Sequence, residues 1–435
     1  MTVNASLPRV SVCGLGAMGI GFSRNLIKKG FTVSGYDIVP ALVDRFVQSG
    51  GTATSSPKEA AENAEVLLVI VINHAQVTSV LFQEKTGAVQ GLSKNAAIII
   101  SSTVPGAYCQ EVRQKLDALG RSDVLLLDCP VSGGASGAAD GNLTIFACGT
   151  DHGMTLCDPV LRAIGSKICR IKKSDGSNGE TGSGANGKVC HQVIPEIAIA
   201  LVAEVMALAA RAGLNTQQVY DHLQSGEGAS WIMKNRIPHA LEGDETVYSA
   251  MTNSQKDSSI IVRTAGEKSV PVPLVATAEQ IYQTTVYLGW AGMDDAALWR
   301  LYLIGQPQDS IYQATKIQSD ADSTISLQDI EDIMVGVHLA ATAESRAFTQ
   351  AVGLNAEQMF DIVCGAAGWN VQFERYAPQM NKGPWFLREV EESKNIGIKL
   401  AKAVAKASSI GAPLPIASAA VQVYELQIGP LSEGA

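Results

Sequence analysis

Six residues near the start of the chain, Gly14-Leu15-Gly16-Ala17-Met18-Gly19, constrain the fold more than any other stretch. They follow an apolar run, Arg9 to Cys13, and precede an amphipathic segment, so the pattern predicts a strand, a tight turn and a helix. A second apolar run begins at Phe31 and ends at Asp37, 18 residues after Gly19 (37 − 19). Glycines at this spacing let a turn approach a pyrophosphate, and an acid after the second strand commonly holds a ribose hydroxyl.

This unit predicts a dinucleotide cofactor. The residues expected to contact it are Gly14, Gly16, Ala17, Met18, Gly19 and Asp37. A carboxylate at position 37 repels a 2′-phosphate, and the following Ile38-Val39-Pro40 offers no arginine to accept one. The sequence therefore favours NAD over NADP.

Three more apolar runs predict further strands of a parallel sheet. Val66 to Ile72 ends at Asn73, Ala97 to Ile100 is followed by Thr103, and Val124 to Leu127 leads into Asp128. Helix-like segments at 58–64 and 107–119 separate them, which is typical of βαβ units. We expect the segment 141–147 to continue the same sheet as a hairpin-like return.

Polar residues gather at the ends of these predicted strands, where ligands of such sheets bind. Asn73 and Thr103 are candidates for cofactor contacts. Ser132-Gly133-Gly134 offers a hydroxyl and unobstructed backbone N–H groups, a suitable cradle for a substrate carboxylate. Taken alone, without the flanking motifs, Ser-Gly-Gly would be interpreted as an ordinary turn.

Length and charge limit the classes of function. A chain of 435 residues that is 46% hydrophobic can bury two or three cores. The net charge of −9 provides no basic stripe for nucleic acid. Eight cysteines are scattered without C-x-x-C spacing, so we expect reduced core residues and no metal site. The first nine residues have no secretory apolar region, and we expect no run long enough to span a membrane, hence a soluble cytoplasmic protein.

Lys188 opens a long apolar helix that the pattern predicts from Val193 to Ala212. We expect it in the first turn, where the helix dipole disfavours a positive charge and tunes a lysine towards proton exchange near neutral pH. His191 lies three residues further on and projects from the same helical face. The alternative is a solvated lysine beside a structural histidine.

The helical part of the chain contains an internal repeat. Residues 203–215 match residues 343–355 at a constant offset of 140 (343 − 203), including Ala-Glu at the start and Gly-Leu-Asn at the end. The match extends to Gly243 and Gly383 and, after a small gap, from Lys256-Asp257 to Lys394-Asn395. We interpret this as a duplicated helical domain.

The two copies differ at the predicted site. Gln328 stands opposite Lys188 and Glu331 opposite His191, so we expect one catalytic site per chain. The glycine-rich stretch 172–184 is the best interdomain connection and is expected to be mobile. The predicted organisation is a cofactor domain over 1–182, a first helical domain over 183–305, a linker over 306–325 and a degenerate second helical domain over 326–435.

Four ordered motifs resemble the β-hydroxyacid dehydrogenase family, which includes 3-hydroxyisobutyrate, tartronate semialdehyde and L-threonate dehydrogenases. They are Gly14 to Gly19, Ser102-Thr103-Val104-Pro105, Asp128 to Gly134 with Gly141-Asn142-Leu143-Thr144, and Gly184 to Lys188. The resemblance covers roughly residues 8–304, with a second partial match over 326–428. His191-Gln192, where many members have asparagine, is similar to the L-threonate dehydrogenase branch.

The resemblance implies an α/β Rossmann-type dinucleotide-binding domain followed by two all-α domains like those of 6-phosphogluconate dehydrogenase, which also doubles its helical domain. It implies that Lys188 is the catalytic acid and base. Ser132, Gly133, Gly134, His191 and Trp231 would contact the substrate, and Lys256 and Asp257 would border the cofactor. Thr103 would face the nicotinamide.

The expected function is NAD-dependent oxidation of a small hydroxy acid, such as the four-carbon L-threonate. Two alternatives stay open from the sequence. One is an NAD(P)H-dependent reductase of an aldehyde, ketone or imine on the same fold. The other is a non-catalytic cofactor-binding or assembly protein. Under each of these interpretations, the protein is expected to be a monomer or a homodimer.

Overall fold

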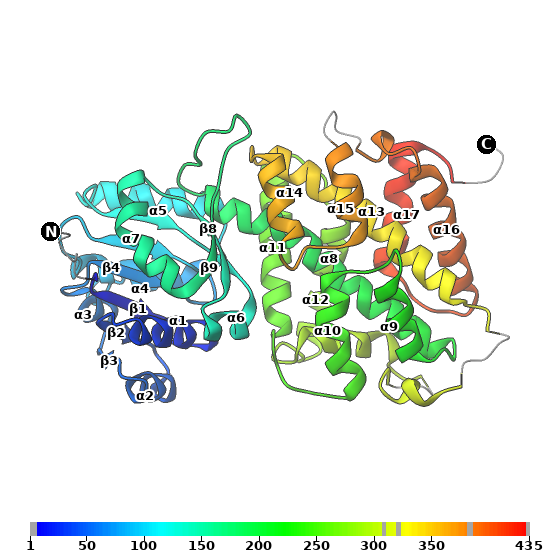
Figure 1. Cartoon of the computed structure of the whole chain (residues 1–435), viewed down its shortest axis with the longest axis horizontal. Coiled ribbons are helices and arrows are strands. Elements are labelled where there is room, and N and C mark those ends of the chain that lie inside the picture. Colours follow the sequence, from blue (N-terminus) through cyan, green and yellow to red (C-terminus); the bar gives the residue numbers. More distant parts are fainter. Residues whose placement is uncertain (1–6, 307–309, 319–322, 381–385, 432–435) are drawn as a thin grey trace. The chain divides into compact units, whose positions relative to one another are not determined.

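The computed structural model describes residues 7–306, 310–318, 323–380 and 386–431. The chain forms two compact units, residues 1–189 and 190–435, which Figure 1 shows coloured along the sequence. The sequence placed the first boundary after residue 182, whereas this division falls inside one continuous helix. The predicted linker 306–325 lies partly outside the described residues, as does Gly383 of the repeat.

The first unit contains a six-stranded sheet in the order β3-β2-β1-β4-β5-β6, with every neighbouring pair parallel. Its strands are β1 (Val10–Cys13), β2 (Val33–Tyr36), β3 (Thr52–Ala53), β4 (Val66–Val69), β5 (Ala97–Ile100) and β6 (Leu125–Asp128). The intervening helices are α1 (Ala17–Lys28), α2 (Pro40–Gln48), α3 (Pro57–Ala61), α4 (His74–Phe82), the short η1 (Ala88–Gln90) and α5 (Gly106–Ala118). This confirms the predicted parallel βαβ sheet.

Each face of the sheet has its own hydrophobic core, because side chains alternate along a strand. On one face Leu68 and Ile99 pack with Phe22 of α1 and Val160 of α7 (Asp151–Ile164). On the other face Leu67 and Ile98 pack with side chains of α4 and α5. Burial on both faces explains why these strands are almost uniformly apolar.

A second sheet corrects the expectation for residues 141–147. Strand β8 (Leu143–Ala147) does not join the main sheet but lies between β7 (Val131–Ser132) and β9 (Gly165–Arg170). It is antiparallel to β7 and parallel to β9. The only bridge recorded to the main sheet in the described chain joins Asp128 to Cys148. Proline at position 130 interrupts the chain after β6, so the following strand starts a new sheet.

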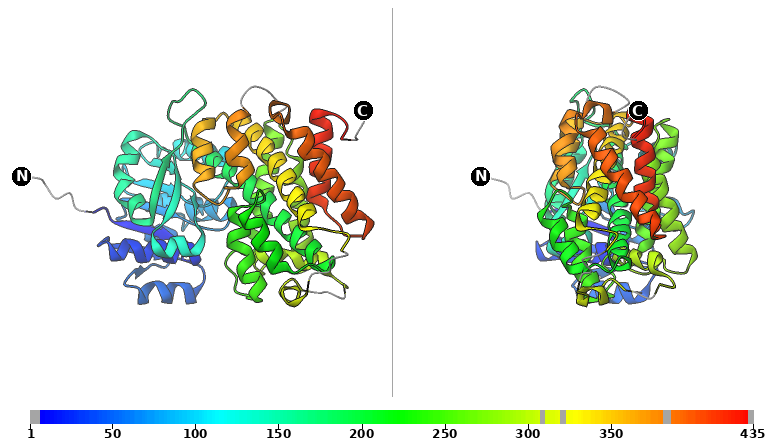
Figure 2. Two further views of the ribbon diagram at one scale, coloured as in Figure 1. Left: turned by 45° about the vertical axis from the view of Figure 1, so that its right-hand side comes forward. Right: turned by 90° about the vertical axis from the view of Figure 1, so that its right-hand side faces the viewer.

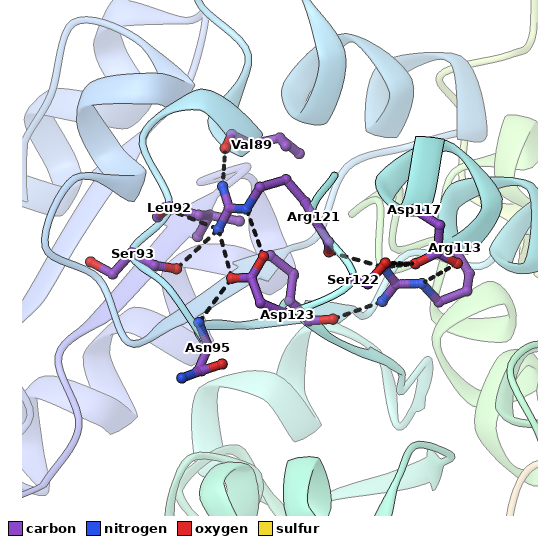
Figure 3. A network of polar contacts seen from close by, with 10 residues as sticks. Val89, Leu92, Ser93, Asn95, Arg113, Asp117, Arg121, Ser122 and Asp123 are labelled. Carbon is purple, nitrogen blue, oxygen red and sulfur yellow. Dashed lines mark hydrogen bonds and ion pairs between the residues drawn. The ribbon is translucent and has the colours of Figure 1, made fainter. Parts of the chain in front are cut away.

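An arginine network ties loops together at the amino-terminal ends of β5 and β6 (Figure 3). The Arg121 guanidinium donates to the carbonyl oxygens of Val89 (2.8 Å) and Leu92 (3.1 Å). It also pairs with Asp123, with Nε 3.0 Å from Oδ1, and this holds the pKa of Asp123 at about 2. The network fixes the edge of the sheet opposite the strand ends that carry the predicted site.

Helix α8 (Ser183–Arg211) corrects two expectations. It has 29 residues, and its most apolar 18-residue window has a mean hydropathy of 2.1. By length and composition it is therefore able to cross a membrane, contrary to the prediction that no run is long enough. Its most apolar window is entirely buried, which explains the composition. The helix also starts five residues before Lys188, which places that lysine in the second turn, where the dipole effect is weak.

The second unit contains two consecutive series of helices. After α8 come α9 (Thr216–Ser225), α10 (Trp231–Glu242), α11 (Met251–Glu267) and α12 (Pro273–Tyr287), then two short segments, η2 (Asp295–Leu303) and η3 (Gln313–Lys316). The second series is α13 (Leu327–Ala351), α14 (Ala356–Cys364), α15 (Val371–Tyr376), η4 (Ala377–Gln379), η5 (Phe386–Glu389), α16 (Ser393–Ser409) and α17 (Pro415–Ile428). Figure 2 shows α16 and α17, coloured red, side by side in both views.

Contacts between the two series are reciprocal. Trp231 N–H donates to the Trp369 carbonyl oxygen (2.9 Å), and Val371 N–H donates to the Ala229 carbonyl oxygen (3.2 Å). Adding or subtracting 140 exchanges these two hydrogen bonds (231 + 140 = 371; 369 − 140 = 229). Between them lies a bridge that joins Ser230 to Asn370, which are themselves 140 apart (370 − 230). The predicted duplication accounts for this reciprocity, since equivalent segments meet each other.

Two buried glutamates make a second reciprocal contact. The Glu204 carboxylate of α8 accepts N–H groups of Ile416 (2.7 Å) and Ala417 (3.3 Å), which are the second and third residues of α17. In turn, the Glu344 carboxylate of α13 accepts the N–H groups of Leu274 and Val275, the second and third residues of α12, each at 2.9 Å. Helices α12 and α17 have no N-cap side chain of their own, so each is capped by the other series.

The helix bounds also correct part of the predicted repeat. Helices α11 and α16 are both 17 residues long and start 142 residues apart (393 − 251), and α12 and α17 start at prolines with the same separation (415 − 273). Asp257 therefore corresponds to Lys399, not to Asn395. The match of Lys256-Asp257 with Lys394-Asn395 is displaced by one helical turn.

The glutamate caps give a prediction about stability. Replacing Glu204 or Glu344 with alanine leaves two helix N–H groups without an acceptor in a buried place, which we expect to lower the free energy of unfolding by about 2–4 kcal/mol each. Urea denaturation followed by circular dichroism measures this. Glu357→Ala, an exposed acid in the first turn of α14, is the control and should cost under about 1 kcal/mol. Equal effects for all three would contradict the capping role.

Candidate functional site

The glycine turn after β1 has the geometry that its sequence predicts. Gly14 adopts φ 99°, and a Cβ there would overlap the Ile70 carbonyl oxygen. A Cβ on Gly19 would overlap the Gly14 carbonyl oxygen, so α1 packs directly against the turn. A Cβ on Gly16 would meet nothing within 4 Å. Gly16 is therefore not required by packing within the protein, and its open side fits a pyrophosphate that approaches the backbone.

Asp37 links the end of β2 to this turn. Its Oδ2 accepts the Leu15 N–H (2.7 Å) and its Oδ1 accepts the Val39 N–H (2.9 Å). The carboxylate is thus held at the position where the sequence expects a ribose contact. Ile38 beside it is 78% exposed, and the segment Ile38-Val39-Pro40 contains no arginine.

The predicted residues after β4 and β5 lie at the same edge of the sheet. Asn73 is the N-cap of α4 and accepts the Gln76 N–H (3.0 Å). Between the two strands, the Ser102 hydroxyl accepts the Val71 N–H (2.8 Å). Thr103 follows and is partly exposed. Because β4 and β5 are parallel neighbours, Asn73 and Thr103 both stand at their carboxyl ends.

Ser132 ends β7, Gly133 is the N-cap of the short helix α6 (Gly134–Asp140), and Gly134 is its first residue. Gly133 and Gly134 have φ of 135° and 65°, a backbone that L side chains rarely adopt. Ser132 is partly exposed and both glycines are exposed. Asn25 of α1 fixes α6 from behind, because its Nδ2 donates to the Ala138 carbonyl oxygen (2.8 Å).

Lys188 is almost buried, with 6% of its surface exposed. Its Nζ lies 5.8 Å from the ring centre of Phe146 on β8. Phe146 and Thr144 share one face of that strand, and Thr144 pairs with Ser132 on β7. The structure therefore brings Lys188 to the same small sheet as the predicted carboxylate cradle, within the first unit.

The sequence motif that contains Asp128 predicts no role for this residue, whereas the structure shows one. It ends β6, is 1% exposed, and its Oδ2 accepts the Ala185 N–H in the first turn of α8 (2.9 Å). A Cβ on Gly184 would overlap the Asp128 carbonyl oxygen, so only glycine permits this approach. Burial raises the pKa of Asp128 to about 7, against the opposing effect of the helix N–H groups. Its position at a predicted strand end was the available signal.

Four residues of the predicted site lie in the second unit and are described there by themselves: His191, Trp231, Lys256 and Asp257. Gln192 Nε2 donates to Asp257 Oδ2 (2.9 Å), and Lys256 Nζ lies 3.2 Å from Asp257 Oδ1. His191 is fully buried, with Nδ1 3.1 Å from Gln192 Oε1. Trp231 is partly exposed at the start of α10. Their contacts with substrate or cofactor stay predictions.

Two family models match this chain. The NAD-binding domain of 6-phosphogluconate dehydrogenase matches residues 9–172. The model described as NAD-binding of NADP-dependent 3-hydroxyisobutyrate dehydrogenase matches twice, over residues 182–302 and 329–429. The second match covers the second helix series.

Relatives agree with these models. L-threonate dehydrogenases of Cupriavidus necator and Escherichia coli K12 are 35% and 36% identical; each alignment spans 67% of this chain and 95% or 94% of the relative. A solved 3-hydroxyisobutyrate dehydrogenase from Salmonella typhimurium is 34% identical over 68% of this chain and 99% of its own, with a TM-score of 0.61. The chain belongs to the β-hydroxyacid dehydrogenase family and is an NAD(P)-binding oxidoreductase.

One further structure bears on the fold alone. 6-Phosphogluconate dehydrogenase of Plasmodium falciparum is 16% identical but matches 96% of this chain and 92% of its own, with a TM-score of 0.68. Its match extends through both helix series, whereas the relatives above stop after about two thirds of the chain. The predicted Rossmann sheet followed by a helical region is confirmed.

The buried carboxyl of Asp128 gives a prediction about pH. Its folded pKa of about 7 lies above the ordinary 3.8, so its contribution to stability is complete below about pH 4 and is lost as the pH rises to 7. The stability of wild type relative to Asp128→Asn should therefore fall over this window, by up to about 1.4 kcal/mol per pH unit. Urea unfolding at several pH values measures the difference.

Asp123→Asn is the matched control. The pKa of Asp123 is lowered to about 2, so its contribution is present above pH 4 and is lost only as the pH falls towards 2. Its difference curve should be flat between pH 5 and 7. A flat curve for Asp128 as well would show that its carboxyl titrates normally.

Proposed function

We propose that this protein is an NAD-dependent dehydrogenase of a small hydroxy acid, with a four-carbon sugar acid such as L-threonate as substrate. The observation that carries the proposal is Lys188, buried at the small sheet that also holds Ser132, Gly133 and Gly134. The identity of 35–36% between this chain and L-threonate dehydrogenases supports the substrate class. His191-Gln192 after the lysine supports the same branch.

The protein's own groups have separable roles in this proposal. Ser132 and the N–H groups at the start of α6 orient the substrate carboxylate. Lys188 accepts the proton of the substrate hydroxyl during oxidation and returns it during reduction. Burial excludes water from around the amine, and Asp128 positions the helix that carries it. His191 is proposed to favour substrates with further hydroxyl groups.

The chain's residues fit a nicotinamide dinucleotide. The open side of Gly16 and the N–H groups at the start of α1 would hold the pyrophosphate, and Asp37 would hold the ribose. Asn73 and Thr103, after β4 and β5, would also contact the cofactor. When bound, the cofactor supplies the hydride acceptor of the oxidation. Lys256 and Asp257 are proposed to border it, by family resemblance.

The first test is activity. NAD⁺ and NADP⁺ are each offered with threonate, erythronate, glycerate and 3-hydroxyisobutyrate, and reduced cofactor is followed by absorbance. We expect the highest kcat/KM with NAD⁺ and a four-carbon polyhydroxy acid. Reduction of aldehydes, ketones or imines with no oxidation of any hydroxy acid would favour the reductase alternative.

Lys188→Ala should lower kcat by about 10²–10⁴-fold, because it removes the proton acceptor. NADH binding, measured by fluorescence enhancement, should be retained. Lys167→Ala, which removes an exposed lysine of β9, is the control and should leave kcat unchanged. Near-wild-type turnover by the Lys188 variant would exclude the assigned role.

Asp37→Asn tests the cofactor preference. The amide can still accept the Leu15 N–H but no longer repels a 2′-phosphate. The ratio of kcat/KM for NAD⁺ to that for NADP⁺ should fall at least about tenfold, which corresponds to ~1.4 kcal/mol. An unchanged ratio would mean that another group sets the preference.

A further inference from the structure

A second candidate site lies entirely within the second unit, away from Lys188 in the sequence. A cavity of about 240 Å³ is walled by α13, α15 and α16, with Glu227 contributed by the segment before α10. At ~30 Å³ per water molecule, this holds a molecule of roughly eight non-hydrogen atoms. None of the residues that line this cavity belongs to the proposed dehydrogenase site.

The cavity occupies positions that correspond to the predicted site of the first series. Gln328 and Glu331 line it and stand 140 residues after Lys188 and His191. Asp332 and Lys399 also line it and correspond to Gln192 and Asp257, at offsets of 140 and 142. The side chains at these two positions differ in charge between the series: the carboxylate of Asp332 replaces the amide of Gln192, and the ammonium of Lys399 replaces the carboxylate of Asp257.

Part of the charge in the walls is already paired. Arg375 binds Glu227, with Nη2 2.9 Å from Oε1. The Glu331 Oε1 atom accepts the backbone N–H of Glu227 (2.8 Å), and its Oε2 atom lies 3.3 Å from His222 Nε2. Beyond these contacts the walls carry the carboxylates of Asp332 and Glu392 and the ammonium of Lys399. The lining residues therefore include four carboxylates against two cations, an excess of charged acceptors.

Asp332 and Gln372 sharpen this excess of acceptors. Burial raises the pKa of Asp332, Asp329 and Glu331 add to the effect, and Lys399 and a hydrogen bond from Gln328 oppose it. Gln372 is 1% exposed and its Nε2 donates to the Glu227 carbonyl oxygen (2.9 Å). Within the described residues its Oε1 accepts no hydrogen bond. A ligand that brings N–H donors and a positive charge matches both groups.

We propose that this cavity binds a small organic ammonium compound, an amino alcohol or a diamine, through Asp332 and Glu392, with Gln372 as a further acceptor. A metal ion fits less well, because the described residues contain no group of His, Cys, Asp or Glu placed to hold one. The site is proposed for binding and not as a second catalytic site, since Gln328 stands where the first series has the lysine. It does not depend on the substrate proposed for the dehydrogenase.

Isothermal titration of the full chain tests the proposal. 1,4-Diaminobutane and 2-aminoethanol are the probes, and butane-1,4-diol is the uncharged control. An ionic strength of about 0.15 M screens the general attraction of amines to a chain of net charge −9. We expect saturable binding of one amine per chain and none of the diol.

Variants separate the cavity from the rest of the surface. Asp332→Asn and Glu392→Gln should each weaken amine binding at least tenfold, which corresponds to ~1.4 kcal/mol. Glu391→Gln, which removes the neighbouring exposed acid outside the cavity, is the matched control and should bind like wild type. Circular dichroism confirms that each variant is folded. No saturable binding of either amine, or equal binding by all three variants, would overturn the proposal.

Discussion

The start of α8 is the contact on which the rest of the first unit's chemistry depends. The chain leaves β9, passes a glycine-rich stretch and must begin a 29-residue helix directly against the end of β6. Gly184 allows the two backbones to meet, and Asp128 accepts the Ala185 N–H there. A buried carboxyl at a helix N-terminus satisfies donors that would otherwise be costly to bury. This contact sets the position of Lys188, one turn further on.

In the second unit, too, buried carboxyl groups accept N–H groups at helix starts, but there each carboxyl group caps a helix of the other series. Glu204 and Glu344 each end up in the interior, where burial raises their pKa to about 8. Each serves as the missing N-cap of a helix in the other series, next to a proline that fixes the first helical turn. Neither series could satisfy both its glutamate and its helix start alone. This interdependence explains why the two series form one compact unit and not two.

The sequence was sufficient for features that depend on local pattern. Glycine spacing and apolar runs predicted the parallel sheet. The offset of 140 predicted the paired starts of α9 with α14 and of α10 with α15, but not the later pairs, which are 142 residues apart. The separate sheet around β8 was missed, because strand partners depend on long-range pairing that an apolar run does not specify. The extra first turn of α8 was missed for a related reason. Glycines at 182, 184 and 187 disfavour helix locally, and only the contacts with Asp128 and its neighbours outweigh that preference.

The comparison of the two series shows which properties of the helical domain follow from packing and which from chemistry. Positions that pack are kept: Glu204 and Glu344 have the same role, and Tyr282 and Tyr424 each donate to a carbonyl of the long helix of their own series. Positions that would face ligands differ in charge, as at 188 and 328 or 257 and 399. We interpret this difference through the predicted duplication: the described chain contains one dinucleotide-type sheet, so the dehydrogenase chemistry proposed here does not constrain the corresponding positions of the second series. Its fold could not change as freely, because the first series depends on Glu344 to cap α12.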